Sequence, residues 1–116
     1  MRSYDSETVL DREQLRDVTM DDPDLMRELL MALVEDTTRQ LDQMETAVAE
    51  RKGDRCKRLA HYSKGACANV GALSAAAICE QMERLAASGD FVRCALSLEA
   101  LASTLERLKA EASTLE

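Results

Sequence analysis

The sequence has no tryptophan, one proline and one histidine, and each of its four cysteines stands alone. A single histidine cannot supply the paired Glu-x-x-His motifs of a di-iron bundle enzyme, and the absence of a CxxC pair argues against a zinc or redox site. The most apolar stretch, Gly65 to Cys79, is shorter than the roughly 20 residues that span a bilayer. We therefore expect no metal site, no cofactor and no membrane span, and we expect the cysteines to be buried free thiols.

Residues with high helix propensity make up much of what is present. Hydrophobic residues account for 46% of the chain and charged residues for 32%, with Ala, Leu, Glu, Arg and Met prominent, which is typical of an all-α protein. The 116 residues suit one domain with a single core. The polar start, Met1 to Asp5, leads into no apolar segment, so we expect no secretory signal and a cytoplasmic location.

Capping residues divide the chain into helices. Asp22-Pro23 places an N-cap aspartate before a proline at the first helical position. Gly53-Asp54 and Gly89-Asp90 each place a helix-ending glycine before an N-cap aspartate. They predict helices at about 11–18, 23–51, 55–70, 72–88 and 91–115. A turn at Gly71 is favoured over one continuous helix through Gly65 to Cys79. Short linkers make sequential helices antiparallel, so we expect an antiparallel up-and-down four-helix bundle with a short additional N-terminal helix.

Two of these helices show an apolar stripe that recurs every three or four residues. In the second helix the stripe is Leu25, Met26, Leu29, Leu30, Leu33, Val34, Thr37, Leu41, Met44 and Val48. In the fifth helix it is Phe91, Ala95, Leu98, Ala102, Leu105, Leu108 and Ala112. We expect both stripes to face the core.

The third predicted helix places its histidine on the face opposite its apolar residues. Helical periodicity groups His61 with six residues on the polar face: Asp54, Lys57, Arg58, Lys64, Gly65 and Ala68. Between Arg51 and Lys64 there are six basic residues and one acidic residue, in a chain whose net charge is −7. This basic patch predicts a site, but it is too small and too poor in aromatic residues to indicate nucleic-acid binding.

These residue types suit the transfer of a phosphoryl group. A neutral imidazole is a competent nucleophile near neutral pH, and a cation one turn away stabilises the dianionic group that its attack on phosphorus produces. Lys64 stands at that position. Gly65 costs about 1 kcal/mol of helix stability relative to alanine, and we expect it to leave space beside the ring for a partner's active site.

The run from Leu59 to Ala72 resembles the signature of histidine-containing phosphotransfer (HPt) domains, which is roughly HxLKG, five further residues and Gly-Ala. The resemblance extends through Gly53-Asp54 and through the segment from Cys79 to Glu83, and it covers the chain from about Val9 onward. It implies one HPt-like domain over residues 1–116 with a core at about 9–115. Ser63 departs from the family's usual leucine, and we expect its hydroxyl to bond the carbonyl four residues back.

The resemblance also implies roles for individual residues. His61 is the phosphoacceptor, Lys64 the cation that stabilises the phosphoryl group, Gly65 the residue that gives access, and Glu83 the residue that orients the imidazole. The surface that docks the partner is expected to include four further residues: Lys57, Arg58, Tyr62 and Ala68.

The implied function is that of a phosphorelay intermediate of two-component signalling. His61 accepts the phosphoryl group from an aspartyl phosphate on a response-regulator receiver domain and passes it on. The partners are receiver domains, a hybrid sensor histidine kinase or both, and the magnesium ion belongs to the receiver. No nucleotide-binding motif is present, so we expect no ATP-dependent kinase activity of the chain's own. We also expect the protein to be a monomer. The alternative is a non-catalytic helical adaptor or scaffold that docks signalling partners. The amino-terminal phosphoacceptor of a chemotaxis-type kinase requires further domains, which a free-standing chain of this length would lack.

Overall fold

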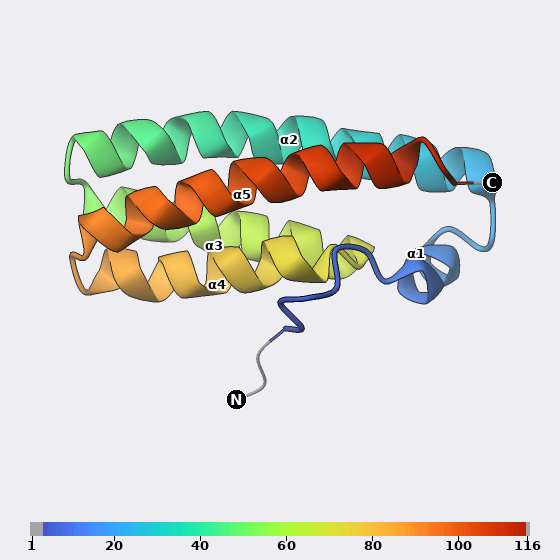
Figure 1. The fold of residues 1–116 in the computed structure, drawn as a ribbon, viewed down its shortest axis with the longest axis horizontal. Helices are drawn as coiled ribbons and strands as arrows, with labels where there is room; N and C mark the ends of the chain where they lie inside the picture. The colour runs from blue at the N-terminus through green and yellow to red at the C-terminus, as the bar shows by residue number, and fades with distance from the viewer. Residues whose placement is uncertain (1–3, 116) are drawn as a thin grey trace.

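The structure, a computed structural model, describes residues 4–115, which form five helices and no strand. The helices are α1 (Arg12–Val18), α2 (Pro23–Ala49), α3 (Gly53–Val70), α4 (Leu73–Ala87) and α5 (Phe91–Ala112). The four long helices run antiparallel, with α2 beside α5 and α3 beside α4, and α1 lies at one end of the bundle (Figure 1). The predicted all-α four-helix bundle with a short N-terminal helix is confirmed. Residues 1–3 of the polar start and residue 116 lie outside the described part of the chain.

Two of the three predicted helix starts are confirmed, and the third is wrong. The Asp22 and Asp90 side chains accept hydrogen bonds from backbone N–H groups in the first turns of α2 and α5. By contrast, Gly53 is the first residue of α3, and its N-cap is Lys52, which makes no side-chain capping bond. A Cβ atom at Gly53 would lie 2.8 Å from the carbonyl oxygen of Ala86 in α4, so the glycine permits close approach of the two helices.

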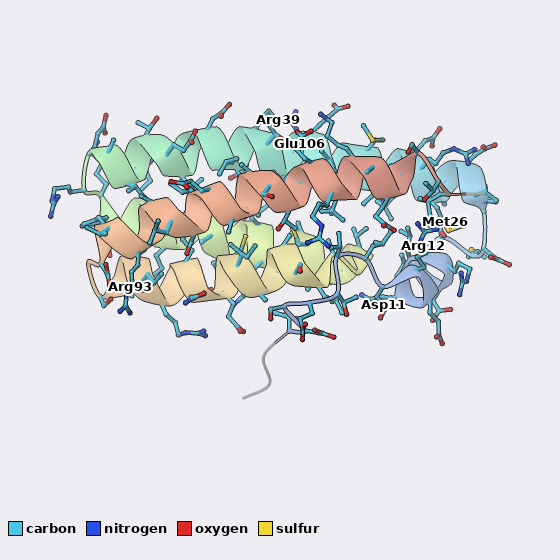
Figure 2. The ribbon with its side chains drawn as sticks, viewed as in Figure 1. Asp11, Arg12, Met26, Arg39, Arg93 and Glu106 are labelled. Atoms are coloured by element: carbon cyan, nitrogen blue, oxygen red, sulfur yellow. The ribbon has the colours of Figure 1, made fainter. Side chains whose placement is uncertain are left out.

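The turn between α3 and α4 is at Gly71, as the sequence predicts. Gly71 has φ +95° and ends α3, and α4 begins at Leu73, which rules out a continuous helix. The segment before α1 covers this turn, since the Asp11 N–H donates to the Gly71 carbonyl at 2.8 Å. At the same end of the molecule, Arg12 pairs with Glu111 and ties α1 to α5; Asp11 and Arg12 are labelled in Figure 2.

The buried side chains confirm most of the two apolar stripes. In α2 seven of the ten stripe positions are buried: Met26, Leu30, Leu33, Val34, Thr37, Leu41 and Met44. Leu29 and Val48 are only partly buried, and Leu25 is 42% exposed. In α5 the residues Ala95 and Ala102 are exposed, contrary to expectation, and Cys94, Leu101 and Thr104 are buried in addition to the predicted leucines. No helix in the described chain has both the length and the apolar content that a membrane crossing needs.

All four cysteines are free and buried, as expected. Burial raises the pKa of Cys56 to about 11 and that of Cys67 to about 11, and it raises the pKa of Cys79 as well. Their thiolate fraction near neutral pH is therefore very small, and the four side chains act as packing residues.

The hydrogen bond predicted for the Ser63 hydroxyl is absent from the described residues, so this prediction is wrong. The side chain is buried on the core face of α3, but within residues 4–115 its Oγ has no hydrogen-bond partner, whereas a bond to the carbonyl four residues back was expected. A buried hydroxyl that has lost its water without gaining a partner costs free energy. Ser63 is thus a local weakness of the core beside the functional face of α3.

We predict that Ser63→Ala raises the free energy of unfolding by about 1 to 2 kcal/mol, because it removes a buried hydroxyl without a partner and adds helix propensity. Urea unfolding measures this change. The matched control is Ser103→Ala on the exposed side of α5, which gains propensity only, about 0.5 kcal/mol. Equal gains in the two variants would show that the Ser63 hydroxyl carries no penalty.

Candidate functional site

His61 lies near the middle of α3, on the face that points away from the core. Its side chain is 66% exposed, whereas Ala60 and Ser63, which flank it in sequence by one and two positions, are buried. The periodicity of α3 explains this placement, because the helix buries one stripe against α2 and α4 and turns the opposite stripe to solvent. The expected position of the imidazole is confirmed.

Glu83 reaches the imidazole from the neighbouring helix α4. Its Oε2 lies 2.9 Å from His61 Nδ1, and its Oε1 lies 2.9 Å from Lys64 Nζ. An ionised carboxylate only accepts hydrogen bonds, so Nδ1–H is the donor and the proton of the neutral ring is on Nδ1. Within residues 4–115, Nε2 makes no hydrogen bond, and the His61 side chain as a whole is 66% exposed.

The same carboxylate is held ionised by its two neighbours. Partial burial disfavours its charge, but the Lys64 ammonium and then the His61 ring outweigh that effect, so the pKa of Glu83 is lowered. Lys64 is only 21% exposed and forms an ion pair with Glu83. His61, Glu83 and Lys64 thus form one connected unit. The ion pair between Lys64 and Glu83 was not predicted from the sequence.

Gly65 lies one turn after His61, in a part of α3 with open space around it. It is exposed, and a Cβ atom built on it would meet no atom of another side chain or helix within 4 Å. Its own turn of α3 therefore has room for a side chain, and packing does not demand a glycine there. Position 65 therefore has the open space that the sequence predicts there.

Three of the four predicted docking residues lie on the exposed surface of α3, and one does not. Lys57, Arg58 and Tyr62 are exposed, and the Tyr62 hydroxyl donates to Asp36 Oδ2 of α2 at 3.0 Å. Ala68 is only partly exposed and packs against the core, and its carbonyl accepts a hydrogen bond from Gln14 of α1. The helical period placed Ala68 correctly on α3 but did not show that α1 covers that end.

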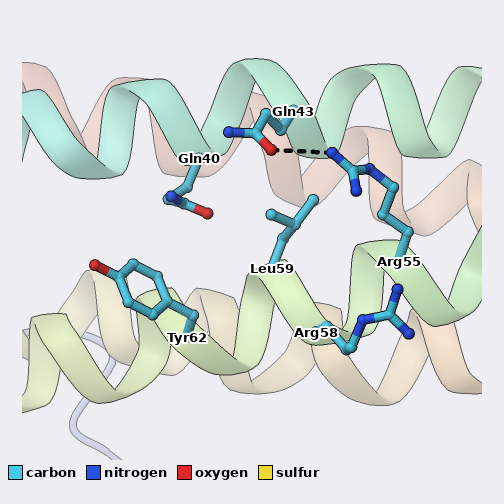
Figure 3. Close-up of a pocket in the computed structure, with 6 residues that line it drawn as sticks. All are labelled: Gln40, Gln43, Arg55, Arg58, Leu59 and Tyr62. Atoms are coloured by element: carbon cyan, nitrogen blue, oxygen red, sulfur yellow. Dashed lines mark hydrogen bonds between the residues drawn. The ribbon is translucent and has the colours of Figure 1, made fainter.

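Two grooves flank the exposed face of α3. One, of about 330 Å³, lies between α2 and α3 and is lined by Gln40, Gln43, Arg55, Arg58, Leu59 and Tyr62 (Figure 3). The other, of about 250 Å³, lies between α3 and α4 and is lined by Lys57, Lys64, Glu80, Glu83, Arg84 and Ala87.

The contribution of α2 to the first groove was not predicted from the sequence. Its only signal was the helical spacing of Asp36, Gln40 and Gln43, a polar stripe beside the apolar one.

Among the described residues, no three His, Cys, Asp or Glu side chains are grouped so that they could hold a metal ion.

Glu83 makes the stability of this site depend on pH. A carboxyl group whose pKa is lower in the folded state stabilises the fold above its unfolded pKa, about 4.3, and loses that contribution as the pH falls through the folded value. We therefore predict that Glu83→Gln costs about 1 to 2 kcal/mol near pH 6 and less near pH 3. Urea unfolding at the two pH values measures this. Glu99→Gln on the exposed side of α5 is the control and is expected to change little at either pH. A cost for Glu83→Gln that stays constant between the two pH values would contradict the ionic role of this carboxylate.

Two solved structures share this fold. One is histidine-containing phosphotransfer protein B from Pseudomonas aeruginosa, with a TM-score of 0.82 and 23% sequence identity over 90% of this chain and 91% of that chain. The other is a rice protein described as a histidine-containing phosphotransfer protein, with a TM-score of 0.82 and 22% identity over 94% of this chain and 80% of that chain. At these identities the similarity shows the fold alone. Comparison with curated protein sequences finds no match.

The family comparison goes further than the fold. A family model described as Hpt domain matches residues 28–111, which is well over half of the chain and includes α3, α4 and most of α2 and α5. The match covers the imidazole, the lysine and glycine that follow it, and the carboxylate on the adjoining helix. This chain therefore belongs to the Hpt domain family and is a phosphorelay intermediate of two-component signalling.

Proposed function

We propose that His61 is the phosphoacceptor and that the phosphoryl group is bound to Nε2. The observation that best supports this is the 2.9 Å contact between Nδ1 and Glu83, which places the ring proton on Nδ1 and leaves the Nε2 lone pair available. His61 is the only histidine of the chain, so no second imidazole competes for the role.

The transfer step balances without a proton leaving the ring. The Nε2 lone pair attacks the phosphorus of the receiver's aspartyl phosphate, an N–P bond forms, and the P–O bond to the aspartate breaks with its electron pair returning to the carboxylate. The product ring keeps its Nδ1 proton and is positively charged. Glu83, which already accepts that Nδ1–H, stabilises this positive charge. The reverse attack by another receiver's aspartate regenerates the neutral ring.

Lys64 and Gly65 assist this step in different ways. Lys64 stabilises the dianionic phosphoryl group, and to do so its ammonium exchanges part of its contact with Glu83 for the phosphoryl oxygens. Gly65 leaves the approach to Nε2 open for the receiver's active site. The receiver supplies the aspartyl phosphate and its magnesium ion.

The setting of this activity is part of the same proposal. The partners are response-regulator receiver domains, alone or within a hybrid sensor histidine kinase, and they dock on the surface around Lys57, Arg58 and Tyr62. The protein acts as a monomer in the cytoplasm, as one domain over residues 1–116 with its core at about 9–115. The shared core of the four long helices supports the single domain.

Transfer of a radioactive phosphoryl group tests the proposal. A receiver domain labelled with radioactive acetyl phosphate is expected to label the wild-type protein, and the label should be acid-labile and base-stable. His61→Gln should remain unlabelled while keeping the circular dichroism spectrum of a folded helical bundle. Label in His61→Gln would show that another residue accepts the phosphoryl group. Unlabelled wild type that still binds the receiver would favour the adaptor alternative.

Substitutions of Gly65 separate access from stability. Gly65→Ala is expected to raise the free energy of unfolding by about 1 kcal/mol, since nothing obstructs a Cβ there. Gly65→Gln is expected to be at least as stable as wild type but to transfer roughly tenfold to a hundredfold more slowly, because its side chain displaces the partner from Nε2. Single-turnover transfer and urea unfolding measure the two effects. Wild-type transfer by Gly65→Gln would contradict the access role.

A further inference from the structure

The groove between α2 and α3 is lined by side chains of a kind that packing between two helices does not require. Its lining combines two arginines of α3, two glutamines of α2, and the apolar surfaces of Leu59 and Tyr62, around about 330 Å³ of space (Figure 3). Arg58 lies one helical turn before His61 on the same helix, so its side chain starts beside the imidazole. A partner that reaches His61 therefore covers this groove as well.

The two arginines have no carboxylate partner within the described chain. Arg55 donates to the neutral amide oxygen of Gln43 at 3.0 Å, and Arg58 makes no ion pair among residues 4–115. Among the described residues, Arg16, Arg51, Lys57 and Arg107 form no ion pair either, but none of these four lines the groove. Eight other basic side chains do form ion pairs: Arg12, Arg27, Arg39, Lys52, Lys64, Arg84, Arg93 and Lys109. The groove thus keeps two guanidinium groups available for an external anion.

The aromatic wall of the groove is held in place from α2. The Tyr62 hydroxyl donates to Asp36 Oδ2 at 3.0 Å, and Asp36 Oδ1 lies 3.4 Å from Arg39. The Asp36 carboxylate is therefore engaged by Tyr62 and Arg39 and does not line the groove. The Tyr62 ring remains 53% exposed, and with Leu59 it offers an apolar surface against which the methylene part of an acidic side chain can pack.

We propose, building on the phosphotransfer function, that this groove receives an aspartate or glutamate side chain from the docking face of the receiver domain. Arg55 and Arg58 bind its carboxylate, Gln40 and Gln43 offer neutral amide donors, and Tyr62 and Leu59 contact its methylene groups. Receivers that carry an acidic residue at the matching position dock productively, and receivers with a basic residue there are repelled. The groove thereby selects among receivers without taking part in the chemistry at Nε2.

The test separates docking from chemistry with two phosphodonors. Phosphoramidate is a small donor that needs no docking surface, whereas phosphorylated receiver domains need one. The double variant Arg55→Glu/Arg58→Glu is compared with wild type and with Arg16→Glu/Arg107→Glu, which makes the same change in net charge at exposed arginines of α1 and α5. A panel of isolated receiver domains from the source genome, each phosphorylated with acetyl phosphate, supplies the second donor.

We expect phosphoramidate to label His61 in all three proteins. Because charge reversal at Arg58, one turn from His61, also repels the anionic phosphoramidate, each receiver rate is divided by the phosphoramidate rate of the same protein. With the receiver that reacts fastest with wild type, kcat/KM should fall by about tenfold or more in the groove variant and by less than about twofold in the control, mainly through KM. Changing the acidic residues of that receiver one at a time to arginine should then find one substitution that restores transfer to the groove variant. Raising the salt concentration should weaken transfer to wild type more than transfer to the groove variant.

Three results would overturn the groove assignment. The first is unchanged transfer in the groove variant, and the second is an equal loss in both double variants, which would reflect net charge alone. The third is restoration by none of the receiver substitutions. Failure of the proposed function looks different, because wild type itself would then remain unlabelled at His61 by both donors.

Discussion

The site depends on the carboxylate of Glu83, which contacts both the imidazole of His61 and the ammonium of Lys64. Glu83 bonds Nδ1 of His61 through one oxygen and pairs with Lys64 through the other, each at 2.9 Å. This arrangement fixes which ring nitrogen has the proton, and it places a negative charge beside the ring, which under the proposed transfer step becomes positive. It also fixes the ammonium close to the imidazole. Without Glu83, the exposed histidine would have neither a defined tautomer nor a defined orientation.

The bundle makes this arrangement possible because it joins α3 and α4 closely. Gly53 allows the start of α3 to approach the end of α4, and the turn at Gly71 brings the other ends together. Glu83 therefore lies opposite His61 although 22 positions separate them in sequence. Meanwhile a Cβ atom built at Gly65, one turn after His61, would meet nothing within 4 Å, so this turn of α3 is open.

Sequence patterns predicted the features that are local in the chain. The caps at Asp22 and Asp90 and the turn at Gly71 depend on neighbouring residues, and the exposed face of His61 follows from helical periodicity. The failures involve contacts between helices. Gly53 appeared to end a helix because its approach to Ala86 is invisible in the sequence. Ser63 is the exception, because the bond expected for its hydroxyl lay within its own helix. The Lys64 ion pair, the Asp36 bond to Tyr62 and the cover over Ala68 likewise require knowledge of which helices meet.

The tautomer of His61 is the most direct test of whether Glu83 holds the ring proton on Nδ1. Long-range proton–nitrogen NMR of nitrogen-15-labelled protein at about pH 8, where a histidine is neutral, distinguishes a protonated from an unprotonated ring nitrogen. We predict that the proton is on Nδ1 in the wild type and that Glu83→Ala gives a mixture of tautomers. A proton on Nε2 in the wild type, or a spectrum that Glu83→Ala does not alter, would contradict the claim that Glu83 prepares Nε2 for attack.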